Sequence, residues 1–203
     1  MLNEELYSTP SSAAVSMFKK DPSLFETYHQ GFRSQTTKWP VNPVDVILKF
    51  LQKYPKWSVA DLGCGDAKIA HSLPKATVHS FDLVSVNAKV TACDIAAVPL
   101  PDASVDAVVL SLALMGTNYA QFLKEANRIA KPGARILVAE VKSRCEEVLD
   151  TFSQLLHDMG FKVDQVDKDN KMFIMLYLTK VGECGALNKL TAPQLKVCQY
   201  KKR

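Results

Sequence analysis

The sequence predicts an α/β fold, in which helices cover both faces of a mostly parallel, doubly wound sheet. Three observations lead to this prediction. Short apolar runs that are typical of buried strands alternate with helix-like segments from about residue 58 to residue 141. One of these runs, 59–62, leads into a glycine turn that opens a helix. Two later apolar segments, 161–166 and 172–179, are separated by the polar stretch 167–171 and indicate an antiparallel hairpin that closes the sheet.

Residues 3–36, before the sheet, are expected to form short helical pieces. Ser11 or Ser12 is placed to cap a helix over 13–19, and Asp21-Pro22 has the order of a cap followed by proline. The proline-rich stretch 39–43 then breaks the pattern and leads into an amphipathic helix over 44–53. Further helices are expected over 68–73, 119–130 and 146–159. We therefore divide the chain into a helical segment over 1–42, a main domain over 43–181 and a tail over 182–203.

Length and composition agree with one domain, because 203 residues with 47% hydrophobic content can bury a full α/β core. No apolar run reaches the roughly 18 residues that a membrane span needs, and no secretory signal opens the chain. We expect a soluble chain, and its Met1-Leu2 start suggests a domain of a longer protein. The five cysteines contain no CxxC pair, which favours a reducing compartment, and the four histidines show no zinc spacing.

The turn Asp61-Leu62-Gly63-Cys64-Gly65 is the first candidate for a ligand site. Gly63 and Gly65 would let the backbone approach a ligand, and the next helix would offer free N–H donors. A tight turn without a ligand explains the two glycines equally well. Support comes from Asp82, which ends a second short strand where two carboxylate oxygens could accept from the hydroxyls of a ribose. The alternative role of Asp82 is turn formation or helix capping.

A third strand end carries Asp94-Ile95, and the run 105–112 supplies a neighbouring strand. A carboxylate and an aliphatic side chain suit adenine, because the first accepts from its exocyclic amine and the second covers its face. A nicotinamide-dependent dehydrogenase would need a third glycine near position 68, where this chain has Lys68. The spacing therefore favours a different nucleoside-containing cofactor.

Together these elements resemble the S-adenosylmethionine-dependent methyltransferases of the seven-strand type. The likeness covers about 43–181 and includes the 61–65 turn, Asp82, Asp94-Ile95 and the late turn and strand over 131–138. It implies a Rossmann-like seven-strand sheet with helices on both faces, a small N-terminal helical extension packing near the cofactor site, S-adenosylmethionine as cofactor and S-adenosylhomocysteine as product. Metal is not expected.

Rarer strings narrow the resemblance. YHQGF over 28–32, SQTTKWP over 34–40 and LMGTN over 114–118 are similar to the nucleolar ribosomal-RNA-processing methyltransferases, the family that includes nucleomethylin. The resemblance implies an enzyme that forms N1-methyladenosine in large-subunit ribosomal RNA, in the nucleus and its nucleolus. In animals it also implies silencing of ribosomal DNA within a chromatin complex.

The resemblance also implies a set of cofactor contacts, carried over position by position. These are His29, Gly63, Asp82, Asp94, Ile95 and Ser111. His29 could bind the carboxylate of the cofactor's methionine end, although a histidine packed among helices is the plainer reading. Ser111 ends the fourth strand, where cofactor and acceptor meet, and could equally be a turn former.

The fourth strand also bears on the reaction. Ser111-Leu112-Ala113-Leu114 lacks the Asn/Asp-Pro-Pro-aromatic string typical of exocyclic amine methylation, and no cysteine stands there as a nucleophile for cytosine C5. The in-plane lone pair of adenine N1 can attack the methyl carbon without a general base, so we expect catalysis by proximity and assign no catalytic residue. The target base must be unpaired or flipped out.

Two groups of side chains could contact RNA. Tyr28, Phe32 and Trp39 could stack on the base or pack in the core. The basic residues Lys19, Lys20, Arg33, Lys38 and Lys56, with the end 200–203, could contact phosphates or be solvated. Two other functions stay open: a cofactor-binding module for a chromatin-silencing complex without turnover, and a methyltransferase for proteins or small molecules.

Overall fold

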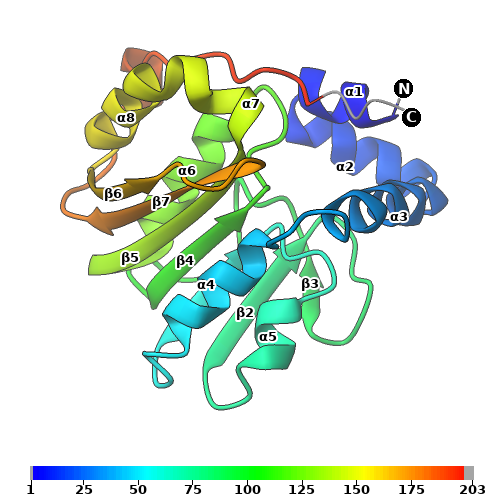
Figure 1. Ribbon diagram of the computed structural model, residues 1–203, viewed down its shortest axis with the longest axis horizontal. Helices are drawn as coiled ribbons and strands as arrows, with labels where there is room; N and C mark the ends of the chain where they lie inside the picture. The colour runs from blue at the N-terminus through cyan, green and yellow to red at the C-terminus, as the bar shows by residue number, and fades with distance from the viewer. Residues whose placement is uncertain (1, 199–203) are drawn as a thin grey trace.

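The computed structural model describes residues 2–198, and its centre is one seven-stranded sheet of order β3-β2-β1-β4-β5-β7-β6 (Figure 1). The strands are β1 (Ser58–Leu62), β2 (Thr77–Asp82), β3 (Val90–Ala92), β4 (Val105–Ser111), β5 (Ala130–Val141), β6 (Phe161–Asp167) and β7 (Phe173–Lys180). All neighbouring pairs are parallel except those of β7, which runs antiparallel to β5 and β6. The sheet confirms the predicted α/β fold and its closing hairpin.

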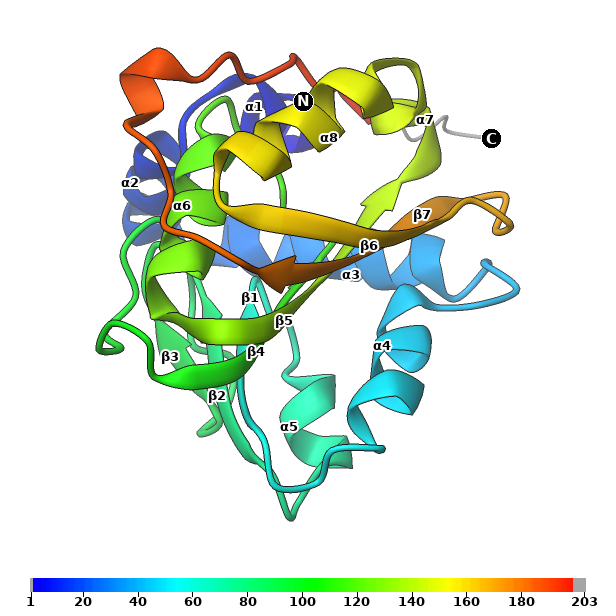
Figure 2. The same ribbon diagram turned by 90° about the vertical axis from the view of Figure 1, so that its left-hand side faces the viewer.

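Helices cover both faces of this sheet and the carboxyl ends of its parallel strands. They are α1 (Leu2–Ser8), α2 (Ser11–Lys20), α3 (Ser23–Thr36), α4 (Pro43–Leu51), α5 (Lys68–Ser72), α6 (Tyr119–Ile129), α7 (Lys142–Cys145) and α8 (Leu149–Asp158), with 3-10 turns η1 (Glu146–Val148) and η2 (Leu187–Lys189). Figure 2 shows α6 and α8 on one side of the sheet and α4 and α5 on the other. The helix predicted over 146–159 begins only at Leu149, after η1.

Burial explains why the sheet could be predicted. Val108, Val109 and Leu110 of β4 are fully buried, because α6 and α8 cover one face of the central strands and α4 the other. A strand buried on both faces gives a continuous apolar run. The start of α4 is fixed by Asn42, whose side chain accepts from Val44 N at 3.0 Å, and by Pro43 in the first turn.

Helices α1, α2 and α3, residues 2–36, pack together beyond the carboxyl ends of the parallel strands, and we call them the cap (Figure 1). A small core of Leu6, Ala14, Phe18 and Phe25 joins them. Asp21 accepts from Ser23 N at 3.0 Å, as its capping role requires. The capping role predicted for Ser11 is wrong, because α2 begins at Ser11 itself and the hydroxyl donates to Asp94 instead.

After β7 the chain runs back across α6 to the cap. Tyr119 Oη donates to Pro193 O at 2.6 Å, and Asn3 Nδ2 donates to Cys198 O at 2.8 Å. Within the described part of the chain, no helix has the length and apolar character that crossing a membrane requires. The basic end 200–203 lies outside the described residues.

Candidate active site

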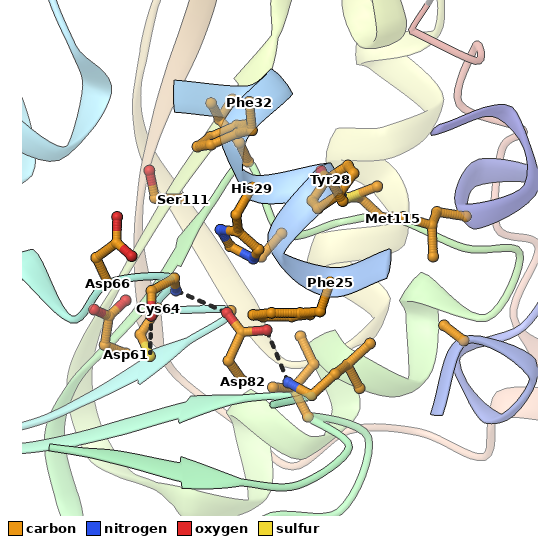
Figure 3. Close-up of a pocket in the computed structure, with 18 of the residues that line it drawn as sticks. Phe25, Tyr28, His29, Phe32, Asp61, Cys64, Asp66, Asp82, Ser111 and Met115 are labelled. Carbon is orange, nitrogen blue, oxygen red and sulfur yellow. Dashed lines mark hydrogen bonds between the residues drawn. The ribbon is translucent and has the colours of Figure 1, made fainter. Parts of the chain in front are cut away.

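A cavity of about 230 Å³ lies between the cap and the carboxyl ends of β1, β2 and β4 (Figure 3). All six residues that the sequence pointed to line it: His29, Gly63, Asp82, Asp94, Ile95 and Ser111. They come from the cap and from four strand ends, so the sheet topology gathers positions that are far apart in the sequence.

The turn after β1 forms the floor of the cavity. Gly63 has φ +76° and Gly65 has φ +54°, conformations that favour glycine. A Cβ on Gly63 would lie 2.7 Å from the Cβ of Ala113, in the loop after β4. A Cβ on Gly65 would lie 3.4 Å from His29 Cε1. The glycines therefore let the loop after β4 and the cap approach the turn closely.

The backbone amides of the turn itself are used within the chain. Gly63 N and Cys64 N donate to Phe81 O at 2.9 and 3.0 Å, which ties β1 to β2. Gly65 N donates to Asp82 Oδ2 at 2.7 Å. The predicted free N–H donors belong to the start of the next helix, α5, which is only five residues long, and they stay a prediction. At this turn the glycines serve mainly by leaving out their side chains.

Asp82 is held by two backbone amides at the end of β2. Its Oδ1 accepts from Leu83 N at 2.8 Å and its Oδ2 from Gly65 N (Figure 3). Burial raises the pKa of Asp82, while the facing His29 and the two amides lower it in part. Each oxygen keeps lone-pair capacity for a further donor, so the carboxyl can still accept from ribose hydroxyls.

The glycine-turn motif did not by itself show that Asp61 belongs to the site. Asp61 lies near the carboxyl end of the buried strand β1, is 3% exposed and lines the cavity. Burial, with the nearby Asp82, raises the pKa of Asp61 to about 7. An acid in an otherwise apolar strand was the signal in the sequence, since buried carboxyls are rare and often functional.

His29 covers the turn from above. Its ring is 7% exposed and lies 4.2 Å, between centroids, from the ring of Phe25. Burial lowers the pKa of His29, so the imidazole is neutral at neutral pH. One helical turn further along, Arg33 donates to Asp66 at 2.8 Å and fastens α3 to the turn after Gly65.

The remaining predicted residues line the cavity from two other strand ends, Asp94 and Ile95 after β3 and Ser111 at the end of β4. Asp94 Oδ1 accepts from Ala96 N at 2.9 Å and its Oδ2 from Ser11 Oγ at 2.7 Å. Ser111 Oγ is buried and finds no hydrogen-bond partner among residues 2–198. A buried hydroxyl without a partner in a cavity wall suits a polar ligand.

The aromatic residues of the cap divide into two groups. Tyr28 and Phe32 line the cavity together with Phe25. Trp39 is not among the lining residues, and its ring stacks on Phe173 at 6.1 Å, so a stacking role on a base is not supported for it. Cys64 also lines the cavity, but burial raises the pKa of its thiol far above the usual range, so it cannot act as a nucleophile.

The sheet order and the cavity at its carboxyl edge define the fold of S-adenosylmethionine-dependent methyltransferases. A solved methyltransferase of this type from Aquifex aeolicus superposes with a TM-score of 0.58 at 23% identity, covering 79% of this chain and 99% of that one. At this identity the likeness shows the fold alone. The family model described as "Hypothetical methyltransferase" matches residues 1–203, and the chain belongs to this family.

Two curated relatives carry the comparison further. Ribosomal RNA-processing protein 8 of Rattus norvegicus is 47% identical over 205 residues, which are all of this chain and 44% of that protein. The 25S rRNA (adenine(645)-N(1))-methyltransferase of Schizosaccharomyces pombe is 46% identical over 215 residues, covering all of this chain and 67% of that protein. The chain thus spans about half the length of the rat relative. The predicted resemblance to ribosomal-RNA-processing methyltransferases is confirmed.

S-adenosylmethionine is the cofactor of this class, and the residues present fit it. The cofactor carries an ammonium, a sulfonium and one carboxylate, and the cavity wall contains four acids, Asp61, Asp66, Asp82 and Asp94. The unpartnered Ser111 hydroxyl offers a further polar contact. The missing side chains at positions 63 and 65 leave the floor open to a ligand that lies against the backbone.

Proposed function

We propose that this chain transfers a methyl group from S-adenosylmethionine to N1 of an adenine in large-subunit ribosomal RNA. The observation that carries the proposal is the 46% identity, over the whole chain, to the fission yeast protein whose name states this activity on 25S rRNA. The cavity described above supports it with a site that fits the methyl donor. The relatives extend beyond the matched region, so their activity is transferred to this chain as a proposal.

The six cavity residues take the following proposed roles. Asp82 accepts from the ribose hydroxyls, Asp94 accepts from the adenine amine, and Ile95 covers the adenine face. His29 binds the carboxylate of the methionine end, Gly63 lets the ligand lie against the backbone, and Ser111 stands where donor and acceptor meet. We propose the same division of the chain as the sequence indicates, with 1–42 covering the cofactor, 43–181 binding it, and 182–203 forming a tail.

Catalysis by this site needs placement more than proton transfer. When bound, the cofactor supplies a methyl group on a positively charged sulfur. Adenine N1 brings its own lone pair, so no residue has to remove a proton. Burial raises the pKa of the Cys64 thiol and so disfavours its thiolate form. Phe25, Tyr28 and Phe32 exclude water from the cavity. The carboxyls in the wall favour the positive charge that passes to the base.

The proposal is tested by methyl transfer from labelled cofactor to ribosomal RNA that lacks the modification, with N1-methyladenosine mapped by mass spectrometry. Gly63→Arg should abolish transfer, because a side chain there meets Ala113 and fills the cofactor floor. Asp82→Ala should reduce cofactor binding. The matched control is Gly31→Arg in α3, since a side chain at Gly31 meets nothing within 4 Å.

Three results would overturn the proposal. One is full activity of Gly63→Arg. Another is tight cofactor binding without transfer to RNA, in an assay where a positive control works, which would indicate a cofactor-binding module of a chromatin complex. The third is label in proteins or metabolites while ribosomal adenosines stay unmodified.

We also propose that the protein acts in the nucleus, in the nucleolus, since the relatives are named for processing ribosomal RNA. A tagged chain viewed by fluorescence microscopy beside a nucleolar marker tests the location. The role in ribosomal DNA silencing rests on the resemblance of the sequence, and loss of silencing marks on ribosomal DNA after deletion of the gene is its test.

A further inference from the structure

The LMGTN loop, residues 114–118 after β4, has no part in the function proposed above, yet it contacts the cap at several points. Thr117 N donates to Thr9 O at 3.1 Å. Gly116 has φ +85°, and a Cβ there would lie 3.0 Å from Thr9 O. Glycine at 116 is therefore needed for the loop to meet the backbone between α1 and α2. Asn118, two residues after Gly116, extends this contact to Ser11 in the cavity wall.

Asn118, Ser11 and Asp94 form a chain of hydrogen bonds with a fixed direction. Asn118 Oδ1 accepts from Ser11 N at 2.8 Å, and Asn118 Nδ2 donates to Ser11 Oγ at 2.8 Å. A backbone N–H can only donate, so the amide oxygen must face it and the amide nitrogen must face the hydroxyl. Since the hydroxyl oxygen already accepts from Asn118, its hydrogen goes to Asp94 Oδ2, 2.7 Å away.

This series of hydrogen bonds fixes the orientation of the Asp94 carboxylate. Its Oδ1 is fixed by Ala96 N, which belongs to the same loop. Its Oδ2 is fixed by Ser11, which belongs to the cap and is 8% exposed. With one donor on each oxygen, the remaining lone pairs are directed rather than free to rotate, and they are available to a ligand in the cavity. The orientation of Asp94 therefore depends on the cap being in place.

We propose that Ser11 is a positioning residue that links docking of the cap to recognition of the cofactor's adenine amine by Asp94. The inference rests on the proposed cofactor site. Because coupling between two binding events is reciprocal, a docked cap strengthens cofactor binding, and a bound cofactor stabilises the docked cap. The LMGTN loop thereby acts on the adenine end of the cofactor through Ser11, while Met115 and Gly116 of the same loop line the cavity.

The test compares two ligands that differ at the amine. Dissociation constants of S-adenosylhomocysteine and S-inosylhomocysteine, in which a carbonyl oxygen replaces the amine, are measured by calorimetry. The unaltered chain should bind the adenosyl compound about tenfold more tightly. Ser11→Ala should weaken that compound about tenfold and the inosyl compound less than about twofold, so the preference disappears. The matched control is Ser16→Ala, an exposed serine of the same helix whose hydroxyl donates to Ser12 O.

The possible results distinguish a failure of the role proposed for Ser11 from a failure of the proposed function. Equal weakening of both ligands by Ser11→Ala would show a merely structural role and overturn the inference, as would no weakening at all. Failure of the unaltered chain to bind S-adenosylhomocysteine would instead overturn the proposed function. If Ser11→Ala does not fold, Asn118→Asp serves in its place: it keeps the acceptor for Ser11 N, loses the donor to Ser11 Oγ and draws the hydroxyl hydrogen away from Asp94. The same selective loss is expected, and an unchanged ligand preference would contradict the inference.

Discussion

The contact between Gly63 and Ala113 allows a quantitative test of how the cavity floor is built. In Gly63→Ala the new methyl carbon would lie 2.7 Å from Ala113 Cβ, whereas carbon atoms in contact are normally about 3.5 Å apart or more. Overpacking of this kind costs about 1–3 kcal/mol. Alanine at φ +76° costs about 1–2 kcal/mol more. Gly63→Ala should therefore lower the free energy of unfolding by about 2–5 kcal/mol.

A double-mutant cycle with Ala113→Gly separates the two costs. Urea unfolding followed by circular dichroism should show that the double variant recovers the contact cost of about 1–3 kcal/mol, because the clashing methyl is gone. The backbone cost at position 63 should remain. Gly31→Ala, in the helix α3 with nothing within 4 Å of the new methyl, is the control and should not destabilise the chain. A Gly63→Ala chain as stable as the parent, or no recovery in the double variant, would refute this account of the floor.

Four further predictions concern the acids and the cap. The apo chain should lose stability as pH rises through about 7, because the raised pKa of Asp61 favours its protonated form, and Asp61→Asn should flatten this urea-midpoint profile. We expect the ionised Asp61 carboxylate to pair with the ammonium of S-adenosylhomocysteine, so this ligand should bind about tenfold more weakly per pH unit below 7 in calorimetry, and the same slope in Asp61→Asn would contradict this role. Buried Arg144 pairs with buried Glu140 at 2.8 Å and also donates to Leu114 O and Lys196 O, so Arg144→Met should cost about 3–5 kcal/mol of unfolding free energy. Adding Glu140→Met should restore the part of that loss that comes from the unpaired carboxyl. Trypsin should cleave the chain after Lys20 more slowly when S-adenosylhomocysteine is present. Arg33→Ala removes the contact between the cap and the glycine turn and should speed this cleavage by up to about fivefold. Cleavage rates that do not depend on the ligand would contradict a docked cap.

The sheet was predictable because its signals are local. Strands such as β4 are buried on both faces and give continuous apolar runs, while glycine and proline mark where they end. The place of the cap was not predictable in this way. Its helices follow from local pattern, but their position over the strand ends depends on contacts with the loop after β4, for example between Thr9 and Thr117.

The same distinction runs through the site. Five of the six expected residues reached one cavity because parallel strands bring their carboxyl ends to one edge, which the sheet topology dictates, whereas His29 reaches it from the cap. Ser11 was misassigned as a helix cap because its hydrogen-bond partner Asp94 is 83 positions away in the chain. The amides of the glycine turn are likewise used by a strand that is distant in the sequence, since Phe81 O and the Asp82 carboxyl accept from them. The local sequence was enough to identify the polar groups, but their hydrogen-bond partners lie far away in the sequence and could not be predicted from it.

The two rare strings that narrowed the family meet in space. Tyr28 of YHQGF donates its hydroxyl to the sulfur of Met115 in LMGTN at 3.0 Å, and both residues line the cavity (Figure 3). The sheet that carries Gly63 and Asp82 belongs to the fold that this chain shares with a solved methyltransferase from Aquifex aeolicus, so we expect its edge to hold the methyl donor and not to select the acceptor. In the proposed reaction, the acceptor base would reach the cavity past the residues of these two strings that line it. We therefore expect the features that distinguish this family from others of the same fold in the cap and in the LMGTN loop. Substitutions confined to the cavity-lining residues of these two parts should change the acceptor, while the sheet edge still binds the cofactor.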